Sequence, residues 1–207
     1  IKNWSVSILL AGAMLWGLQC YSASSLKFAQ VSDVHFYTGE NNTTFKMIAE
    51  SPKLLDDAID QINSTPNVSF VMFTGDQIDK SFEKELSAFL PHTTKLNAPW
   101  YFAFGNHDTC IGGYLTPALY MQLVNEYNKN YKFEKSYYSF VPQKGYKAIV
   151  LDTIIRDRLT SNGRLGEQQL AWLDNELSNS KKDTVLIFMH VPVIEPYNSP
   201  NHRLLDA

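Results

Sequence analysis

Aspartate, histidine and asparagine side chains follow four short apolar runs of this sequence, at positions where they could bind metal ions. Asp33 and His35 follow the first run, residues 75–79 the second, residues 105–108 the third, and His190 the last. Side chains two positions apart point to the same side of an extended segment, so Asp33 and His35 can reach one ion. Carboxylate, imidazole and amide-oxygen donors together suit divalent ions such as Mn, Fe, Zn or Ni, and no thiolate belongs to the set, which argues against a structural zinc site.

The order of these four sequence motifs is stronger evidence for a metal site than any single motif. Asp-x-His and Gly-Asp-x-x-Asp occur by chance in many chains, and a lone histidine such as His190 is more often structural than a ligand. Gly-Asn-His-Asp is more specific, because four residues must match. Glycines before Asp76 and Asn106 permit tight turns that bring the next side chain over the strand ends. All four pieces in series, each after a predicted strand, indicate a shared metal site in which Asp76 is best placed to bridge two ions.

Short, nearly continuous apolar runs must position these donors. They are too short for core helices and fit strands that are buried on both faces. The predicted strands are residues 26–31, 68–73, 100–104, 149–151 and 185–189. A β-hairpin is also predicted, with residues 137–141 and 147–151 on either side of a turn at residues 142–145.

Helical patterns lie between the predicted strands. Ser51 followed by Pro52 predicts the start of one helix, Ser81 is a candidate cap for the next, Thr116 followed by a proline opens a third, and Gly166 precedes a fourth with leucines on one face. The resulting order, β-α-β-α-β-α-β-β-α-β, predicts an α/β domain with a layered sheet. In such sheets, sites lie beyond the carboxyl ends of the strands, which is where the candidate ligands fall.

Composition and charge exclude several classes of protein. The chain has 207 residues, enough for one domain with a substantial core, and 19% charged residues, which is ordinary for a globular protein. The formal charge is −3 and no run of Lys or Arg occurs, so a nucleic-acid partner is not expected. Two cysteines cannot form the disulfide framework of a small secreted domain.

The first 25 residues have the layout of a secretory signal peptide. Lys2 precedes an apolar run at residues 6–18, and small and polar residues follow. The run is about 13 residues long, whereas a membrane-spanning helix needs about 20, so no stable span is expected after cleavage. The prediction is therefore a secreted or periplasmic protein, with an uncleaved anchor or a buried helix as alternatives. Cys20 offers lipid anchoring as a further, less favoured alternative, because the residues before it match a bacterial lipidation signal poorly.

At these motifs the chain resembles the calcineurin-like metallophosphoesterase superfamily. The superfamily's series is Asp-x-His, Gly-Asp-x-x-Asp, Gly-Asn-His-Asp/Glu, a lone His and finally Gly-His-x-His, and this sequence has the first four. The resemblance covers residues 26–207 and implies a layered α-β-β-α sandwich. It also implies a binuclear-metal phosphoesterase with two divalent ions, in which a water shared by the ions attacks the phosphorus.

The resemblance assigns the metal ligands residue by residue. Asp33 and His35 would bind one ion, Asp76 would bridge both ions, and Asn106 and His190 would bind the second ion.

The same resemblance assigns the remaining polar residues. His107 would donate a proton to the leaving group, and Asp108 would orient His107. Asp79 is expected to have a supporting or structural role rather than to bind metal. His92 and His202 match no motif and are expected to be surface histidines, although the loop that carries His202 could touch a substrate.

One part of the family pattern is missing. The closing Gly-His-x-His motif normally follows the lone-histidine strand by a helix and another strand, whereas only 17 residues follow His190 here. Residues 204–207 look like the start of a helix. The expectation is a truncated sequence in which the C-terminal part of the domain is missing and each ion lacks one histidine. A non-catalytic binding module on the same fold, and a plain α/β domain with accidental motifs, are the alternatives.

The motifs identify the substrate less closely than they identify the type of reaction. Asp-x-His with Gly-Asp-x-x-Asp resembles the branch that contains cyclic-nucleotide and glycerophosphodiester hydrolases, together with monoesterases. The expected substrate is a small phosphodiester or phosphomonoester. No arginine stands beside the Gly-Asn-His-Asp motif, which disfavours a protein phosphatase, and the acidic balance disfavours a nuclease.

Overall fold

The computed structural model describes residues 25–194 and 201–205. Residues 1–24 lie outside the described part, and with them nearly all of the predicted signal peptide and Cys20. Within the described residues, no helix has both the length and the apolar character that crossing a membrane requires.

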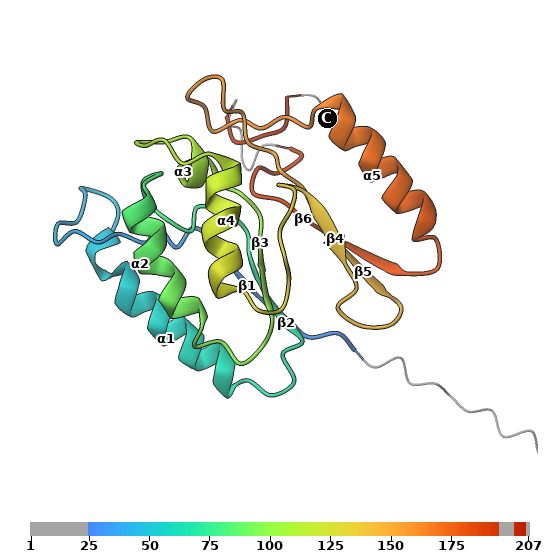
Figure 1. Ribbon diagram of the computed structural model, residues 1–207, viewed down its shortest axis with the longest axis horizontal. Helices are drawn as coiled ribbons and strands as arrows, with labels where there is room; N and C mark the ends of the chain where they lie inside the picture. Colours follow the sequence, from blue (N-terminus) through green and yellow to red (C-terminus); the bar gives the residue numbers. More distant parts are fainter. Residues whose placement is uncertain (1–24, 195–200, 206–207) are drawn as a thin grey trace, which may run out of the picture.

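The first sheet is parallel and contains three of the predicted strands. Its order is β1 (Phe28–Val31), β2 (Phe70–Phe73) and β3 (Trp100–Phe102). All residues of the central strand β2 are buried, as its continuous apolar run predicts. Since the three strands are parallel, their carboxyl ends lie at one edge of the sheet, next to the short helix α3 (Asn106–Thr109) (Figure 1).

The second sheet contains the predicted hairpin and one further strand. β4 (Tyr138–Phe140) pairs antiparallel with β5 (Tyr146–Val150), and β5 pairs parallel with β6 (Thr184–Phe188). The expectation that every strand is buried on both faces is wrong for β6, where Ile187 is 42% exposed. It is also wrong for β1, the edge strand of the first sheet, where Gln30 is exposed and no residue is fully buried. The reason is position, because β6 is an edge strand of the described sheet and its outer face is only partly covered.

The two sheets pack face to face through aromatic side chains. Tyr101 of β3 stacks on Phe140 of β4 with ring centroids 3.6 Å apart, and Phe70 of β2 meets Phe140 edge-on at 5.3 Å. Phe70 also lies edge-on to Phe188 of β6 at 6.0 Å. These rings form part of one hydrophobic core that spans both sheets.

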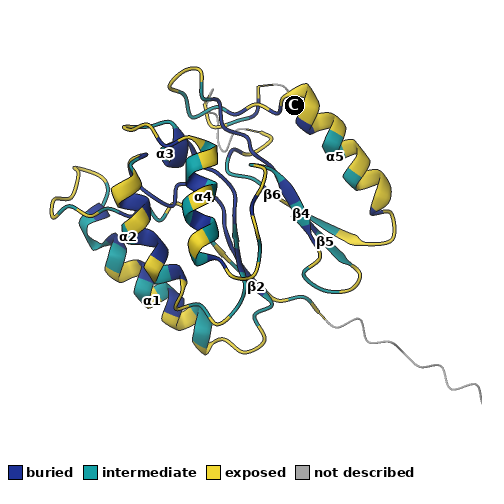
Figure 2. Ribbon diagram, in the orientation of Figure 1, coloured by how far each residue is buried: buried dark blue, intermediate teal, exposed yellow. Residues whose placement is uncertain are grey.

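Helices cover the outer faces of the two sheets. α1 (Ser51–Ser64), α2 (Glu83–Thr93) and α4 (Pro117–Tyr127) lie beside the first sheet, and α5 (Glu167–Asn179) lies beside the second (Figure 1). The predicted α-β-β-α sandwich is therefore confirmed. α5 is the least buried of these layers (Figure 2): Leu170 and Leu177 on its predicted apolar face are each 39% exposed, and Leu173 packs against the core.

The predicted helix starts differ in how well they agree with the structure. Thr116 caps α4, where its hydroxyl accepts a hydrogen bond from the Leu119 N–H at 3.2 Å, and Gly166 directly precedes α5, as predicted. Ser81 does not cap α2. Its hydroxyl instead donates to the carbonyl of Asp108 at 3.0 Å and accepts from the Leu115 N–H at 3.1 Å, so it ties two loops together.

Candidate metal centre

The loops after β1 and β2 continue to pair beyond the ends of the strands. The N–H of Asp33 donates to the carbonyl of Gly75 at 3.1 Å, and the N–H of His35 donates to the carbonyl of Asp76 at 2.9 Å. The backbone therefore sets the first two motifs side by side.

Three candidate ligands have a backbone that non-glycine residues rarely adopt. Asp33, His35 and Asp76 have φ angles of 54°, 46° and 52°, in the left-handed region. The Asp33–His35 stretch is therefore not simply extended, as the sequence argument assumed. The two side chains are nevertheless close, since Nε2 of His35 lies 3.9 Å from Oδ1 of Asp33.

Asp76 lies at the centre of the cluster and is almost fully buried. Its Oδ2 is 3.7 Å from Nε2 of His35 and 4.0 Å from Nε2 of His107, and its Oδ1 is 3.5 Å from Nε2 of His190. Oδ1 also accepts a hydrogen bond from the N–H of His107 at 2.9 Å. Both carboxylate oxygens thus face imidazoles that come from different loops, which is the arrangement a bridging ligand needs.

His190 brings the second sheet to the cluster. Its Nδ1 lies 2.9 Å from the carbonyl of Thr74, and its Nε2 lies 3.2 Å from Oδ1 of Asn106. A carbonyl on one ring nitrogen fixes the tautomer and leaves the other nitrogen available as a ligand. Gly75 makes this placement feasible, because a Cβ atom at that position would collide with the His190 ring and its φ is 102°.

Two groups of side chains have the donor types and the spacing for a cation. Asp33, Asp76 and His190 form one group, and His35, Asp79 and His107 form the other; the ligand atoms of each group lie within 4.8 Å of one another. Burial is the main cause that lowers the pKa of His35; the charges of Asp76 and Asp79 oppose this shift, and those of His107 and Lys46 add to it. Because cations bind the neutral imidazole, this favours the ligand form. The donor types therefore fit divalent cations. The grouping differs from the prediction, which gave Asp33 and His35 to one ion, and it includes Asp79, which was expected to have a supporting role.

His107 is held by a different partner from the one predicted. Its Nδ1 lies 2.5 Å from the backbone carbonyl of Asp79, and its ring meets the His35 ring edge-on with centroids 4.6 Å apart. The Asp108 carboxylate accepts hydrogen bonds from the N–H groups of Gly105 at 2.7 Å and Ile78 at 3.2 Å. In the described contacts, Asp108 therefore fixes the turn that carries His107, and the ring itself is oriented by Asp79.

Asp108 is fully buried, with 0% of its surface exposed. Burial, together with the neighbouring Asp76 charge, raises the pKa of Asp108 well above its usual range, while backbone hydrogen bonds from Gly105, Ile78 and Gln77 act in the opposite direction.

A cavity of about 480 Å³ opens over the cluster. Besides the candidate ligands and His107, its lining contains residues that no motif indicates: Lys46, Ile111, Leu159, Thr160, Ser161 and His202. The Nζ atom of Lys46 lies 3.2 Å from Nε2 of His35 and 3.7 Å from Oδ1 of Asp79. Lys46 had no sequence signal, because it reaches the cluster only through the fold of the loop that follows β1.

One wall of this cavity is a short segment near the end of the described chain. Leu204 pairs with Gly163 in an isolated β-bridge, and its N–H donates to the carbonyl of Pro192 at 3.0 Å. The start of a helix expected at residues 204–207 is wrong for residues 204 and 205, because pairing with the loop around Gly163 satisfies this backbone instead, and residues 206–207 lie outside the described part. His202 is exposed, as expected of a surface histidine, and it also lines the cavity.

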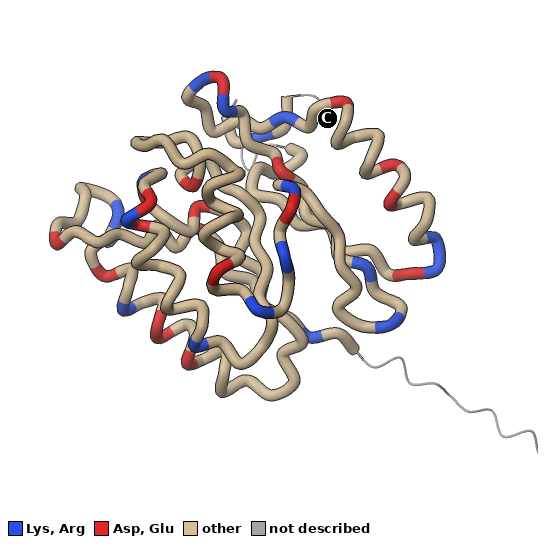
Figure 3. The backbone as a smooth tube through the Cα atoms, in the orientation of Figure 1, with Lys and Arg blue, Asp and Glu red and all other residues tan. Residues whose placement is uncertain are grey.

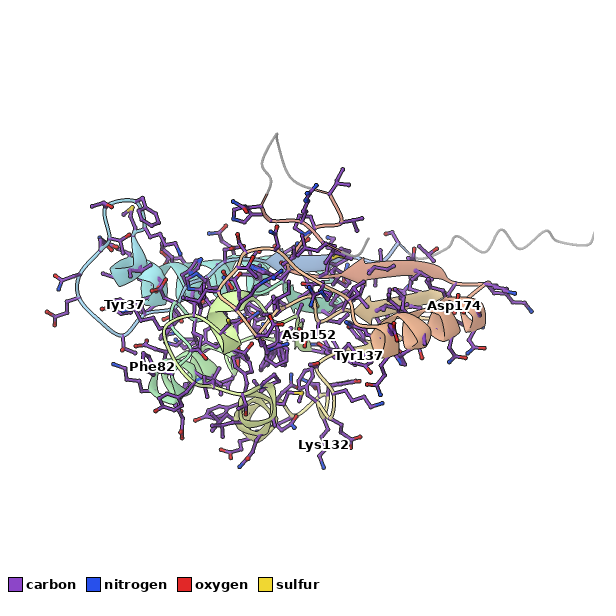
Figure 4. The ribbon with its side chains drawn as sticks, turned by 90° about the horizontal axis from the view of Figure 1, so that it is seen from above. Tyr37, Phe82, Lys132, Tyr137, Asp152 and Asp174 are labelled. Atoms are coloured by element: carbon purple, nitrogen blue, oxygen red, sulfur yellow. The ribbon has the colours of Figure 1, made fainter. Side chains whose placement is uncertain are left out.

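An arginine does lie beside the Gly-Asn-His-Asp turn in space, although none is adjacent in the sequence. Arg156 donates from Nε to the hydroxyl of Thr109 at 2.9 Å, and from Nη1 and Nη2 to the two oxygens of Asp152 at 3.0 and 3.1 Å. Asp152 lies in the interior of the molecule (Figure 4). The guanidinium is thus engaged in holding α3 against the end of β5 and does not line the cavity.

Comparison with known proteins places this site in a family. The family of calcineurin-like phosphoesterases matches residues 26–206, so the chain belongs to it. The chain is 28% identical over 169 residues to a probable glycerophosphodiester phosphodiesterase of Arcobacter nitrofigilis, an alignment that covers 80% of this chain and 57% of that protein. It is 25% identical to the tartrate-resistant acid phosphatase type 5 of Oryctolagus cuniculus, over 99% of this chain and 68% of that protein.

A solved structure shares the fold. A dimetal phosphatase from Danio rerio superposes with a TM-score of 0.60 at 20% sequence identity, covering 82% of this chain and 70% of that one. The chain thus spans between 57% and 70% of the length of these three relatives.

Proposed function

We propose that this protein is a secreted, metal-dependent phosphoesterase that hydrolyses small phosphodiesters or phosphomonoesters. The observation that carries the proposal is the position of Asp76, whose two oxygens face His35, His107 and His190 from three separate loops. The family match supports the reaction class, and both a phosphodiesterase and an acid phosphatase are among the relatives.

The ligand set fits two divalent ions of the Mn, Fe, Zn or Ni type. Asp33 and His35 would hold one ion, Asn106 and His190 the other, and Asp76 would contact both. Two bound ions would supply an activated water and would neutralise charge on the phosphoryl group. The chain's own part is to fix these donors, which it does with left-handed loop backbone and with imidazoles oriented by backbone carbonyls.

His107 is the proposed general acid. It lines the cavity, and the hydrogen bond at Nδ1 to the carbonyl of Asp79 leaves Nε2 facing the cluster, 4.0 Å from Asp76. A proton given from Nε2 to the leaving oxygen would prevent a free alkoxide from forming. The Asp108 carboxylate maintains this geometry by holding the turn at Gly105.

Two features bear on location and partners. The signal-peptide layout of residues 1–25 supports export, which fusion of those residues to a reporter enzyme tests by the fraction of reporter activity in the medium. Lys and Arg positions are interspersed with Asp and Glu positions along the backbone in Figure 3, and this mixture supports a small substrate rather than a nucleic acid.

The reaction is tested on the full chain after loading with Mn, Zn or Fe. We expect about two ions per chain by elemental analysis and turnover of bis(4-nitrophenyl) phosphate or 4-nitrophenyl phosphate. Asp76→Asn should lose both ions and activity, whereas Asp57→Asn, on the exposed side of α1, should retain them. Stoichiometric metal without turnover of either ester would contradict the proposal and favour a non-catalytic binding module.

A further inference from the structure

The loop between β1 and α1 presents one lysine to the cavity. The Thr43 hydroxyl accepts a hydrogen bond from the Lys46 N–H at 2.8 Å, and the Thr43 N–H donates to the Lys46 carbonyl at 3.0 Å. Asn42 ties the same turn to the helix that follows, through Glu50 at 3.0 Å and the N–H of Ala49 at 2.9 Å. The backbone of Lys46 is therefore fixed close to the cluster, while its flexible four-carbon side chain lets the ammonium change position.

Lys46 brings a positive charge to a cavity that also contains carboxylates. Among the described residues that line the cavity, it is the only lysine or arginine, and it faces a lining that includes the carboxylates of Asp33 and Asp76. Its side chain is 28% exposed, so the ammonium can move without unpacking the core.

The Lys46 ammonium lies where a cation bound by His35 would repel it. Nζ lies 3.2 Å from Nε2 of His35, and the same Nε2 atom faces Asp33 at 3.9 Å and Asp76 at 3.7 Å. A divalent ion held by these groups would repel the ammonium, because like charges this close are strongly unfavourable at a partly buried site. The Lys46 ammonium must then turn away from His35, and the space open to it is the cavity that receives the substrate.

We propose that Lys46 binds a terminal oxygen of the substrate's phosphoryl group and thereby favours phosphomonoesters over phosphodiesters. This inference rests on the proposed phosphoesterase function. A phosphomonoester carries close to two negative charges at neutral pH, since its second pKa is about 6, whereas a diester carries one. An ammonium is a compact point charge that responds to this difference, and a diester also replaces one terminal oxygen with an esterified one.

The test compares Lys46→Met with the wild type in the metal-loaded full chain. The kcat/KM for 4-nitrophenyl phosphate should fall roughly 10- to 100-fold, as expected for one lost charge-assisted hydrogen bond, while that for bis(4-nitrophenyl) phosphate should change by less than about 3-fold. Calorimetric binding of inorganic phosphate should weaken by a similar factor as the monoester kcat/KM. Metal content should not fall.

Two further variants control for charge and folding. Lys46→Arg keeps a positive charge and should retain most of the preference for the monoester. If Lys46→Met folds poorly, this variant still tests whether the charge at residue 46 sets the preference. Lys53→Met removes an exposed lysine of α1 and should leave both esters unaffected.

Each remaining outcome counts against one specific claim. Equal losses for the two esters, or unchanged phosphate binding, would overturn the role of Lys46. A gain in metal affinity with unchanged phosphate binding would also overturn it, because Lys46 would then serve only as a counter-ion of the acidic cluster. If the wild type hydrolyses neither ester, the proposed function fails, and phosphate calorimetry still decides whether Lys46 binds the anion.

Discussion

At the scale of single residues, the site is marked by backbone strain. Asp33, His35 and Asp76 all adopt the left-handed conformation, which costs about 1–3 kcal/mol for each non-glycine residue. Such strain persists only where surrounding contacts hold it, and here the loops after β1 and β2 hydrogen-bond to each other at Asp33 and His35. Asn67 and His202 share this conformation, with φ angles of 62° and 63°, but Asp33, His35 and Asp76 are residues that the sequence motifs identify as ligands, which supports a functional reason for their strain.

Gly75 offers a direct test of how tightly the loops are packed. Gly75→Ala should destabilise the protein by about 1–3 kcal/mol or more, because φ is 102°, a value that alanine adopts only with strain. It should also displace His190, because the added Cβ would collide with the ring. Urea unfolding measures the loss, and metal titration measures the effect on the ligand set. The matched control is Gly166→Ala, where φ is −68° and no atom lies within 4 Å of the added Cβ. Equal stability of the two variants would contradict this account.

His107 should separate catalysis from metal binding. His107→Gln should reduce turnover by about 10²–10⁴-fold, the usual contribution of a general acid, with little change in metal content. Elemental analysis and steady-state kinetics on one preparation measure both. His92→Gln is the control, since His92 pairs with Asp56 on the helical side of the first sheet, away from the cavity lining. A parallel loss of metal and activity would mean that His107 is a ligand instead.

The motifs predicted which residues gather at the site, but not all of their contacts. Asp33, His35, Asp76, Asn106 and His190 come together as predicted. The first four follow the parallel strands of the first sheet, whose carboxyl ends share one edge, and His190 reaches that edge from the end of β6 in the second sheet. Local sequence could not predict that the backbone carbonyl of Asp79 holds His107, since that contact depends on how two loops are registered against each other. The same reason explains why Lys46 was missed.

At the scale of elements, α1 and α2 are joined by a small ion network on the surface. The Asp56 carboxylate of α1 lies 2.7 Å from Nζ of Lys95 and 2.6 Å from Nδ1 of His92. The hydrogen bond from Lys95 is the main cause that lowers the pKa of Asp56; desolvation opposes the shift, and His92 adds to it. The network therefore stabilises the packing of the two helices only while Asp56 is ionised.

This lowered pKa predicts a pH-dependent contribution to stability. The contribution is present above the unfolded-state pKa of Asp56 and disappears as the pH falls through its lower folded-state pKa. Asp56→Asn should therefore cost about 0.5–1 kcal/mol at pH 7, the usual range for an exposed ion pair, and less below pH 3. Urea unfolding at both pH values measures the gap between wild type and variant. A gap that is as wide at low pH as at pH 7 would argue against the assignment.

Element type was more predictable from the sequence than element boundaries. The continuous apolar run predicted β2 because the strand is buried on all sides, and the Thr116-Pro117 pair predicted the start of α4 because its capping interaction is local. The predicted cap of α2 at Ser81 is wrong for the opposite reason: the hydroxyl of Ser81 bonds to two distant partners, Asp108 and Leu115, instead of to the start of the helix. Long-range hydrogen bonds of this kind leave no local pattern.

At the scale of the whole molecule, the site lies where the two sheets meet. His190 follows β6 of the second sheet and contacts Thr74 and Asn106, which follow β2 and β3 of the first. Below the site, the hydroxyl of Tyr138 accepts from the N–H of Phe102 at 3.0 Å and donates to its carbonyl at 2.7 Å, which also crosses between the sheets. Cations held by Asp76 and His190 together would add a further link between the two halves of the sandwich.

Metal binding should therefore raise the stability of the entire fold and not only complete the site. A ligand at 100 times its Kd stabilises the native state by about 2.7 kcal/mol, which corresponds to a rise in Tm of about 5–10 °C for a chain of this size. Scanning calorimetry of the full chain with added Mn or Zn, compared with the same chain in EDTA, measures the shift. Asp76→Asn should melt at the same temperature in both conditions, because the residue that joins the ligand groups is lost. If metal bound the wild-type protein but left its Tm unchanged, the unfolded chain would bind the ions as tightly as the folded chain does, and the folded arrangement of Asp76 and His190 would not be what holds them.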